Sequence, residues 1–256
     1  GHTGREAVLD VGPVAHGGHC GARHEGRGGF VRHAIPGEKV RVRLTDAGDS
    51  AKFWRADVIE VLEASPDRVE HFWRPADSLR AWSHGHPPVG GAEFGHIALA
   101  RQRSLKADVL AEQLTRLAGF EQVPSVWTGS VEAVGEKNDG GAGLGWRTRV
   151  SFSVTPAGRL GMHAHRSDHV IPVREMPLAS EAINALHLWD LDLQGVERVE
   201  VAAPANGSRP LVLLAPAPGT KEKRLRAIAA DVPGEASVAG FDPLTGHVTQ
   251  LRGRTW

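Results

Sequence analysis

Glycine punctuation near the start of the sequence is the feature that most constrains how this chain can fold. Glycines recur at positions 12, 17, 18, 21, 26, 28, 29 and 37, and short extended stretches lie between them. In residues 38–44, valines and a leucine alternate with charged residues, which is typical of a strand with one wet face and one dry face. Several short strands separated by glycine turns predict a five-stranded barrel of the OB type over residues 1–65.

The rest of the chain is expected to form a connector followed by a domain of mixed α and β structure. Residues 70–96 are rich in His, Trp, Pro and Gly and show no periodicity, whereas residues 98–117 follow a helical pattern. Leu99, Leu105, Val109 and Leu117 form the apolar stripe of this helix, and Gly119 is its expected C-cap. Beyond residue 123, strands alternate with turns. We therefore expect an α+β protein with a barrel at 1–65, a connector and helix at 66–122, and an α+β domain at 123–256.

The expected elements can be placed by residue. In the barrel we expect strands at 8–11, 30–33, 38–44 and 53–62, and in the last domain at 147–154, 160–165, 169–173, 196–201 and 211–214. Helices are expected at 180–188 and 221–230, followed by a hairpin at 240–251. The glycine-rich stretch 135–145 is expected to be a mobile loop.

Composition excludes several classes of protein. Hydrophobic residues make up 41% and charged residues 23% of the chain, as in an ordinary globular protein. The only cysteine is Cys20, so an intrachain disulfide and an all-cysteine metal or iron–sulfur site are excluded. No apolar run approaches the roughly 18 residues of a membrane span, and the start, which lacks Met, is no signal peptide. We expect a cytoplasmic protein whose first residues are foreign to it, or a fragment of a longer one.

Basic residues are locally concentrated although the formal net charge is zero. Residues 23–43 carry six basic side chains against two acids, and residues 146–174 carry five arginines against Asp168. Such clusters can contact the phosphates of RNA without reading its sequence. The alternative for the first cluster is a solvated strand edge, and a GC-rich genome would by itself raise the arginine content.

The order of short motifs resembles a known family. Residues 14–31 (VAHGGHCGARHEGRGGFV) and 35–40 (IPGEKV) resemble a TRAM domain, the RNA-binding barrel of RNA-modifying enzymes. Further motifs look like the region that follows TRAM in bacterial RNA (uracil-5-)-methyltransferases. They are DRVE at 67–70, His96, QRSLK at 102–106, LGWRTRV at 144–150, GRLGMH at 158–163 and IPVREMPLA at 171–179. The resemblance covers nearly the whole chain.

This resemblance implies the RNA-binding portion of an S-adenosylmethionine-dependent methyltransferase that acts on ribosomal or transfer RNA. In that family a cysteine thiolate adds to C6 of a flipped-out uracil, C5 takes the methyl group, and a base removes the C5 proton. The intact enzyme would be a monomer, whereas this chain by itself could self-associate through its helical stripe. The expected RNA-binding residues are Arg23, Arg27, Arg32, Lys39, Arg41, Arg43, Arg103, Lys106, Arg147, Arg149 and Arg166.

The chain departs from the family in three respects. Residues 73–96 lack the cysteines that often hold a four-iron cluster, so we expect none, and we expect packing by Phe72, Trp73, Trp82 and Phe94 instead. The family's S-adenosylmethionine-binding Rossmann-like domain is not recognisable, since the glycines at 141–145 precede a strand instead of following one. The nucleophilic cysteine and the base belong to that domain, and Cys20 is expected to be a structural thiol. The chain by itself is therefore expected to be inactive and to bind no cofactor.

Other readings of the sequence are weaker. The histidines at 163, 165 and 169, and the pair at 84 and 86, suggest zinc, but no Asp or Cys completes a tetrahedral set at a familiar spacing, so no metal site is expected. A free-standing RNA-binding module without a catalytic domain is the alternative function. A hydrolase that uses one of the histidines lacks a nucleophile constellation.

Overall fold

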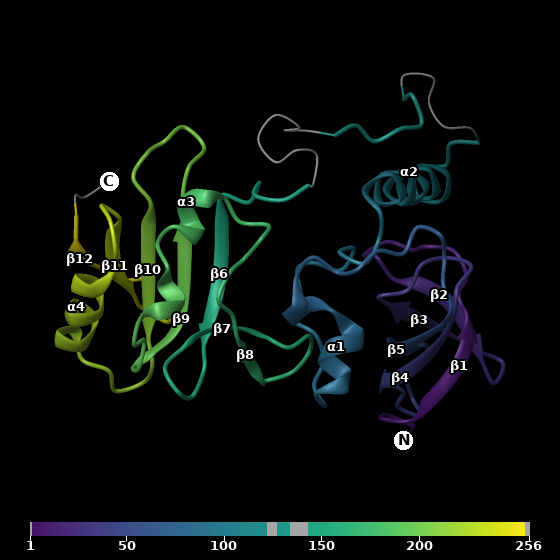
Figure 1. The fold of residues 1–256 in the computed structure, drawn as a ribbon, viewed down its shortest axis with the longest axis horizontal. Helices are drawn as coiled ribbons and strands as arrows, with labels where there is room; N and C mark the ends of the chain where they lie inside the picture. The colour runs from purple at the N-terminus through teal and green to yellow at the C-terminus, as the bar shows by residue number, and fades with distance from the viewer. Residues whose placement is uncertain (1, 122–126, 134–142, 254–256) are drawn as a thin grey trace. The chain divides into compact units, whose positions relative to one another are not determined.

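The computed structural model describes residues 2–121, 127–133 and 143–253, and Figure 1 shows its course. The chain divides into two compact units, Gly1–Val134 and Gly135–Trp256.

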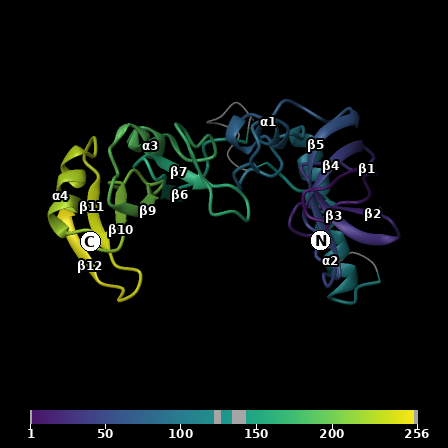
Figure 2. The ribbon, with the colours of Figure 1, turned by 90° about the horizontal axis from the view of Figure 1, so that it is seen from below.

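The first unit is built on a five-stranded sheet. Its strands are β1 (Glu6–Asp10), β2 (Cys20–His24), β3 (Arg27–Arg32), β4 (Lys39–Asp46) and β5 (Trp54–Glu63), in the spatial order β1-β4-β5-β3-β2. The pair β3–β5 is parallel and the other pairs are antiparallel. Figure 2 shows the strands of this sheet in a second view. The four strands expected in this region are confirmed, and β2 lies within the glycine-rich segment where no strand was placed.

The alternation of buried and exposed residues in β4 and one glycine in β3 explain how this sheet packs against its core. Val40, Val42 and Leu44 of β4 are buried, as the strand pattern predicts, and pack with Trp54 and Val58 of β5. The Trp54 indole lies against the backbone of β3, and its Nε1 donates to the carbonyl of Arg27 at 2.9 Å. A Cβ at Gly29 would lie 2.0 Å from the Trp54 ring, so only glycine fits there.

The irregular stretch after the sheet is organised by hydrogen bonds as well as by apolar packing. It contains a 3-10 turn, η1 (Arg74–Ala76), and a short helix, α1 (Ser78–Ser83). His71 is buried; its Nδ1 accepts from the backbone N–H of Trp73, so its Nε2 donates to the carbonyl of Ala92. The expected packing by aromatic residues holds for Trp73, which is 1% exposed, and is wrong for Phe72, which is 38% exposed.

The expected helix is confirmed as α2 (Leu99–Arg116). Its anchor is Leu105, which packs with Ile35 and Ile97. The expected stripe does not continue to Leu117, which lies past the last turn and is 67% exposed. Gly119 follows with φ +70°, as expected for a residue just beyond a helix end.

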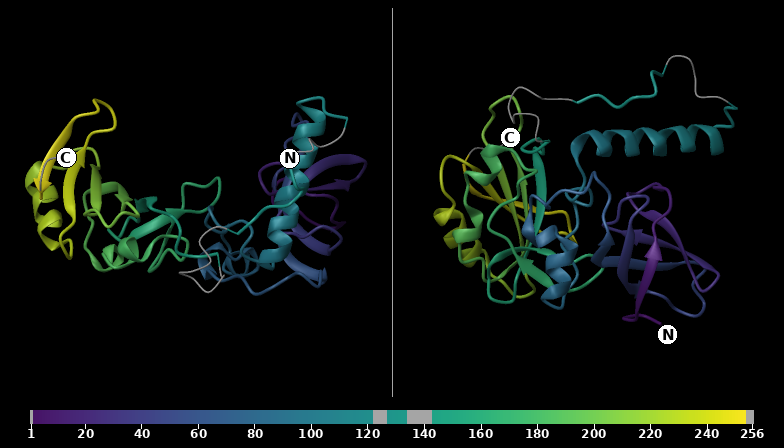
Figure 3. Two further views of the ribbon diagram at one scale, coloured as in Figure 1. Left: turned by 90° about the horizontal axis from the view of Figure 1, so that it is seen from above. Right: turned by 45° about the vertical axis from the view of Figure 1, so that its right-hand side comes forward.

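The second unit contains a seven-stranded sheet in the order β12-β11-β10-β9-β6-β7-β8. The strands are β6 (Arg149–Val154), β7 (Leu160–His163), β8 (Val170–Pro172), β9 (Val196–Ala202), β10 (Leu211–Pro216), β11 (Ser237–Phe241) and β12 (Val248–Arg252). Only β10–β11 is a parallel pair, and α4 (Glu222–Asp231) connects these two strands and packs on β11 and β12 (Figure 3).

Most elements expected in this unit are confirmed. The helix expected at 180–188 is shorter, since α3 (Glu181–Asn184) is followed by a separate 3-10 turn, η2 (Leu188–Asp190). His187 between them has φ +46°, which breaks the helix. The stretch 135–145, expected to be a mobile loop, lies largely outside the described residues.

Candidate nucleic-acid interface

In the first unit, the solvent-facing side of the sheet collects side chains from three strands. Phe30 of β3 lies opposite Gly21 of β2 and next to Arg55 of β5, and Arg23 lies opposite Gly28 two residues along the same ladder. Residues directly opposite each other in a ladder point to the same face of a sheet. Arg23, Phe30 and Arg55 therefore share this face, while Val31 and Trp54 point into the core.

Two of the expected RNA-binding residues are engaged inside the fold. Arg32 is 6% exposed and its Nη2 lies 3.0 Å from Oε1 of Glu93. The guanidinium of Arg43 lies 5.0 Å from the ring of Trp82, whose Nε1 donates to Asp57 at 3.1 Å. These contacts fasten the stretch after the sheet onto its outer face. The burial of Arg32 leaves it no surface for a phosphate, so we drop it from the expected interface.

The buried carboxylate beneath these contacts supports the same conclusion. Asp57 is 2% exposed, and burial raises its pKa, with Arg32 and the hydrogen bond from Trp82 opposing that rise. Arg32 therefore compensates a buried acid, and it is a structural residue.

The other expected residues of the first unit lie at the surface. Arg23 is exposed and Arg27 is half-buried, with its Nη2 donating to the carbonyl of Gly48 at 3.1 Å. Arg41 pairs with Glu60 at 2.8 Å, which raises its pKa, and Lys39 lies 4.0 Å from Glu63. Exposed pairs of this kind are weak, so these cations can exchange a carboxylate for a phosphate. On α2, Lys106 is exposed and Arg103 is half-buried.

This surface also carries an aromatic cluster that the pattern of basic residues in the sequence did not indicate. The rings of Phe30 and Phe53 lie 5.5 Å apart at 59°, and the ring of His19 lies 6.1 Å from that of Phe30. Lys52 and Arg55 lie against the two phenylalanines, at 5.4 Å and 6.0 Å from the ring centres. The signal in the sequence was Phe30, an aromatic residue on the solvent-facing side of an expected strand. A count of charged residues does not register it.

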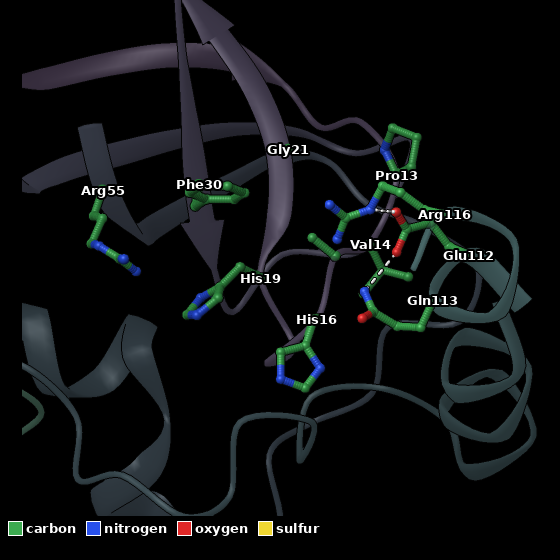
Figure 4. A pocket seen from close by; sticks show the side chains of 11 residues that line it. Pro13, Val14, His16, His19, Gly21, Phe30, Arg55, Glu112, Gln113 and Arg116 are labelled. Carbon is green, nitrogen blue, oxygen red and sulfur yellow. Dashed lines mark hydrogen bonds and ion pairs between the residues drawn. The ribbon is translucent and has the colours of Figure 1, made fainter. Parts of the chain in front are cut away.

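A pocket of about 510 Å³ opens beside this cluster (Figure 4). Phe30, His19 and Arg55 lie on one side of it, and the last turns of α2 contribute Glu112 and Arg116. Oε1 of Glu112 accepts from Arg116 and its Oε2 from Gln113, so this acid is already neutralised by its own helix.

In the second unit, the expected residues lie around an exposed tryptophan. Trp146 is 60% exposed, and the Arg147 guanidinium lies 5.1 Å from its ring centre. Arg149 projects from β6 and pairs with Glu200 of β9 at 2.7 Å, with three quarters of its side chain exposed. Arg166 is exposed, in a turn where its φ is +53°. Trp146 and Arg147 together offer a ring and a cation at the surface.

The one thiol of the sequence is not available as a nucleophile. Cys20 is 2% exposed, and burial raises the pKa of its thiol to about 12, so the thiolate is not formed near neutral pH. No cluster of three His, Cys, Asp or Glu suited to a metal ion occurs in residues 2–121, 127–133 and 143–253. Within the same residues, no helix is long and apolar enough to cross a membrane.

Comparison with known proteins gives relatives of one kind. No family model matches the chain. A Streptomyces avermitilis protein named as an uncharacterized RNA methyltransferase is 38% identical over 99% of this chain and 56% of its own length. A Streptomyces coelicolor protein of the same description is 39% identical over 98% of this chain and 53% of its own. A Shewanella denitrificans 23S rRNA (uracil(1939)-C(5))-methyltransferase is 28% identical over 70% of this chain and 35% of its own.

The fold is also found in solved structures. The Pyrococcus abyssi tRNA (uracil-54, C5)-methyltransferase, solved with S-adenosyl-L-homocysteine, matches with a TM-score of 0.53 at 14% identity. The match covers 94% of this chain and 53% of that one. The chain thus spans about half the length of the relatives and of the structure that it matches.

Proposed function

We propose that this chain is the RNA-binding portion of an S-adenosylmethionine-dependent RNA (uracil-C5)-methyltransferase. The observation that carries the proposal is that two surfaces with cations and aromatic rings occur in a chain whose relatives are named RNA methyltransferases. Those relatives match almost the whole chain. Each surface joins a cation to an exposed aromatic ring: Lys52 lies over Phe53 in the first unit, and Arg147 lies over Trp146 in the second. Cations hold phosphates and rings stack on unpaired bases, which is how proteins bind single-stranded parts of RNA.

In this proposal the first unit carries a TRAM-type OB barrel. Support comes from the strand order and the parallel β3–β5 pair, together with two hydrogen bonds between the ends of that order. Gly12 N–H donates to the carbonyl of Gly21, and Gly21 N–H donates to the carbonyl of Pro13, both within 2.9 Å. A Cβ at Gly12 would lie 2.8 Å from the Gly21 carbonyl oxygen, so the close approach of these segments needs a glycine.

The described residues do not fit S-adenosylmethionine. Their parallel strand–helix–strand unit, β10–α4–β11, turns through residues 217–221 with Gly219 as its one glycine, and proline precedes it. This is not the glycine-rich turn that brings a backbone close to such a cofactor. One buried cysteine likewise cannot hold a four-iron cluster. We propose that cofactor and nucleophile belong to the part of the relatives that this chain does not match.

Calorimetry and a methyl-transfer assay test this division of labour. We expect no heat of binding with S-adenosylmethionine and no tritium-methyl transfer to uridine-rich RNA. Micromolar cofactor binding, or methylation that Cys20→Ser abolishes, would overturn it. A preparation with stoichiometric iron and sulfide would equally contradict the expectation of a cluster-free chain.

A further inference from the structure

The Phe30–Phe53 pair is an exposed apolar surface on an otherwise polar face. Phe53 is 45% exposed and Phe30 is partly exposed, although both flank a well-filled core. A contiguous aromatic surface left in water marks a binding site more often than a single exposed residue does. The cluster is therefore a candidate site for an occupant with a flat, apolar face.

The two rings are held in place by the sheet. The parallel pairing of β3 with β5 puts Phe30 beside Arg55, and Phe53 directly precedes Trp54, which is buried and hydrogen-bonded to the carbonyl of Arg27. The ring of Phe53 lies along β3 at the backbone of Gly28, where a Cβ would be in ordinary contact at 3.8 Å. Because the surrounding backbone is fixed, little ordering is needed when a ligand stacks there.

The charge around the rings selects an anionic occupant. Lys52 and Arg55 each lie over one ring, and Arg23 lies on the same face of the sheet. Within the part of the chain that the structure describes, no carboxylate forms an ion pair with these three cations. A flat apolar face flanked by unpaired cations is complementary to a nucleobase with phosphates on either side.

Resting on the RNA-binding function proposed above, we propose that Phe30 and Phe53 form a stacking platform for an unpaired base of single-stranded RNA. Lys52 and Arg55 hold the phosphates next to that base. The neighbouring pocket, which Phe30 and Arg55 also line, leaves room for the following nucleotide beside the last turns of α2. A paired base cannot use the platform because its faces are covered by its neighbours in the helix.

A first test uses the wild-type chain and two fluorescein-labelled oligoribonucleotides of the same length, one intact and one with abasic positions. We expect the intact strand to bind about tenfold more tightly, the effect of one stacked base. An oligoribonucleotide with 2-aminopurine should lose fluorescence on binding as the base stacks. Equal affinity for intact and abasic strands would overturn the platform and indicate plain phosphate binding.

A second test compares Phe53→Leu with Phe72→Leu, the same change at an exposed phenylalanine elsewhere in the first unit. We expect Phe53→Leu to weaken single-strand binding about tenfold, Phe72→Leu to leave it unchanged, and Phe53→Trp to retain it. Duplex RNA should bind all variants alike. Circular dichroism checks that each variant is folded. The comparison of intact and abasic strands uses only the wild-type chain, so it is valid even if a variant does not fold.

The outcomes separate this proposal from the broader one. If the wild-type chain binds no RNA, the proposed function fails and the platform fails with it. If it binds RNA while Phe53→Leu binds as tightly as wild type, the platform is wrong and the RNA-binding function survives.

Discussion

At the scale of single residues, one buried ion pair fastens residue 68 to the first sheet. The side chain of Glu38 is fully buried, and Arg68 donates to both of its oxygens at 2.7 and 2.8 Å. The backbone N–H groups of Ile35 and Ser65 complete its set of donors. Burial raises the pKa of Glu38, but these hydrogen bonds outweigh burial and hold it below the ordinary value. The buried carboxylate of Glu38 is thus stabilised because N–H groups donate hydrogen bonds to both of its oxygens.

Removing that charge should be costly. We expect Glu38→Gln to lower the free energy of unfolding by about 3–5 kcal/mol, because it strands the Arg68 guanidinium. Glu60→Gln, at the exposed pair with Arg41, should cost far less, because solvent screens that pair. Urea denaturation followed by tryptophan fluorescence measures both. Equal losses for the two variants would contradict the assignment of Glu38 as the structural anchor.

His96 should make stability depend on pH. Its ring is 4% exposed, and burial lowers its pKa from 6.5 to about 4, with Arg68 and His71 acting in the same direction. Between these values the unfolded chain binds more protons than the folded one. Stability is therefore full above pH 6.5 and is lost as the pH falls toward 4, by about 3 kcal/mol.

Unfolding free energies measured from pH 7 down to 4 test this dependence. The curve of His96→Gln should be flatter than that of wild type. A variant at position 96 with an unchanged pH slope would show that His96 is not the titrating group.

At the scale of elements, the β3–β5 pair depends on Gly29. We expect Gly29→Ala to destabilise the first unit by about 3 kcal/mol or more, because its methyl group would collide with the Trp54 ring. Gly48→Ala is the matched control, since a Cβ there meets nothing within 4 Å. Its effect on stability should be within about 1 kcal/mol of zero. Thermal unfolding distinguishes the two, and a tolerated alanine at position 29 would refute the packing described for Trp54.

Elements with a strong local signal were predictable, and those set by distant contacts were not. The alternation in residues 38–44 predicted β4 because its period reflects burial directly. The role of Arg32 could not be predicted, since its partner Glu93 lies far along the chain in an irregular stretch. The aromatic cluster was missed for the same reason: Phe30 and Phe53 meet only because β3 and β5 pair in parallel.

On the second unit, the surface around Trp146 should contribute to RNA affinity. We expect Arg147→Ala with Arg149→Ala to weaken binding and to reduce the salt dependence, the slope of log Kobs against log salt, by about 1 to 2. Arg209→Ala with Arg226→Ala removes two exposed arginines of the same unit outside residues 146–174 and should change neither quantity. Fluorescence anisotropy with a structured RNA measures both, and equal effects of the two pairs would argue against a localised surface.

At the scale of the whole molecule, the chain proposed to bind RNA has a formal net charge of zero. Its basic residues can therefore contribute only where they are concentrated along the sequence, as in residues 23–43 and 146–174. Both units carry such a cluster beside an exposed ring, and each can be tested without knowing how the units are placed. The expected division at residue 123 into a connector and a second domain stays a prediction.

The most direct test of RNA binding is the affinity of the wild-type chain for a labelled stem-loop RNA as salt is raised from about 50 to about 200 mM. If the clusters contact phosphate, log Kobs falls linearly with log salt and binding weakens at least tenfold over that range. Affinity that is the same at both salt concentrations, or no binding at the lower one, would contradict the account.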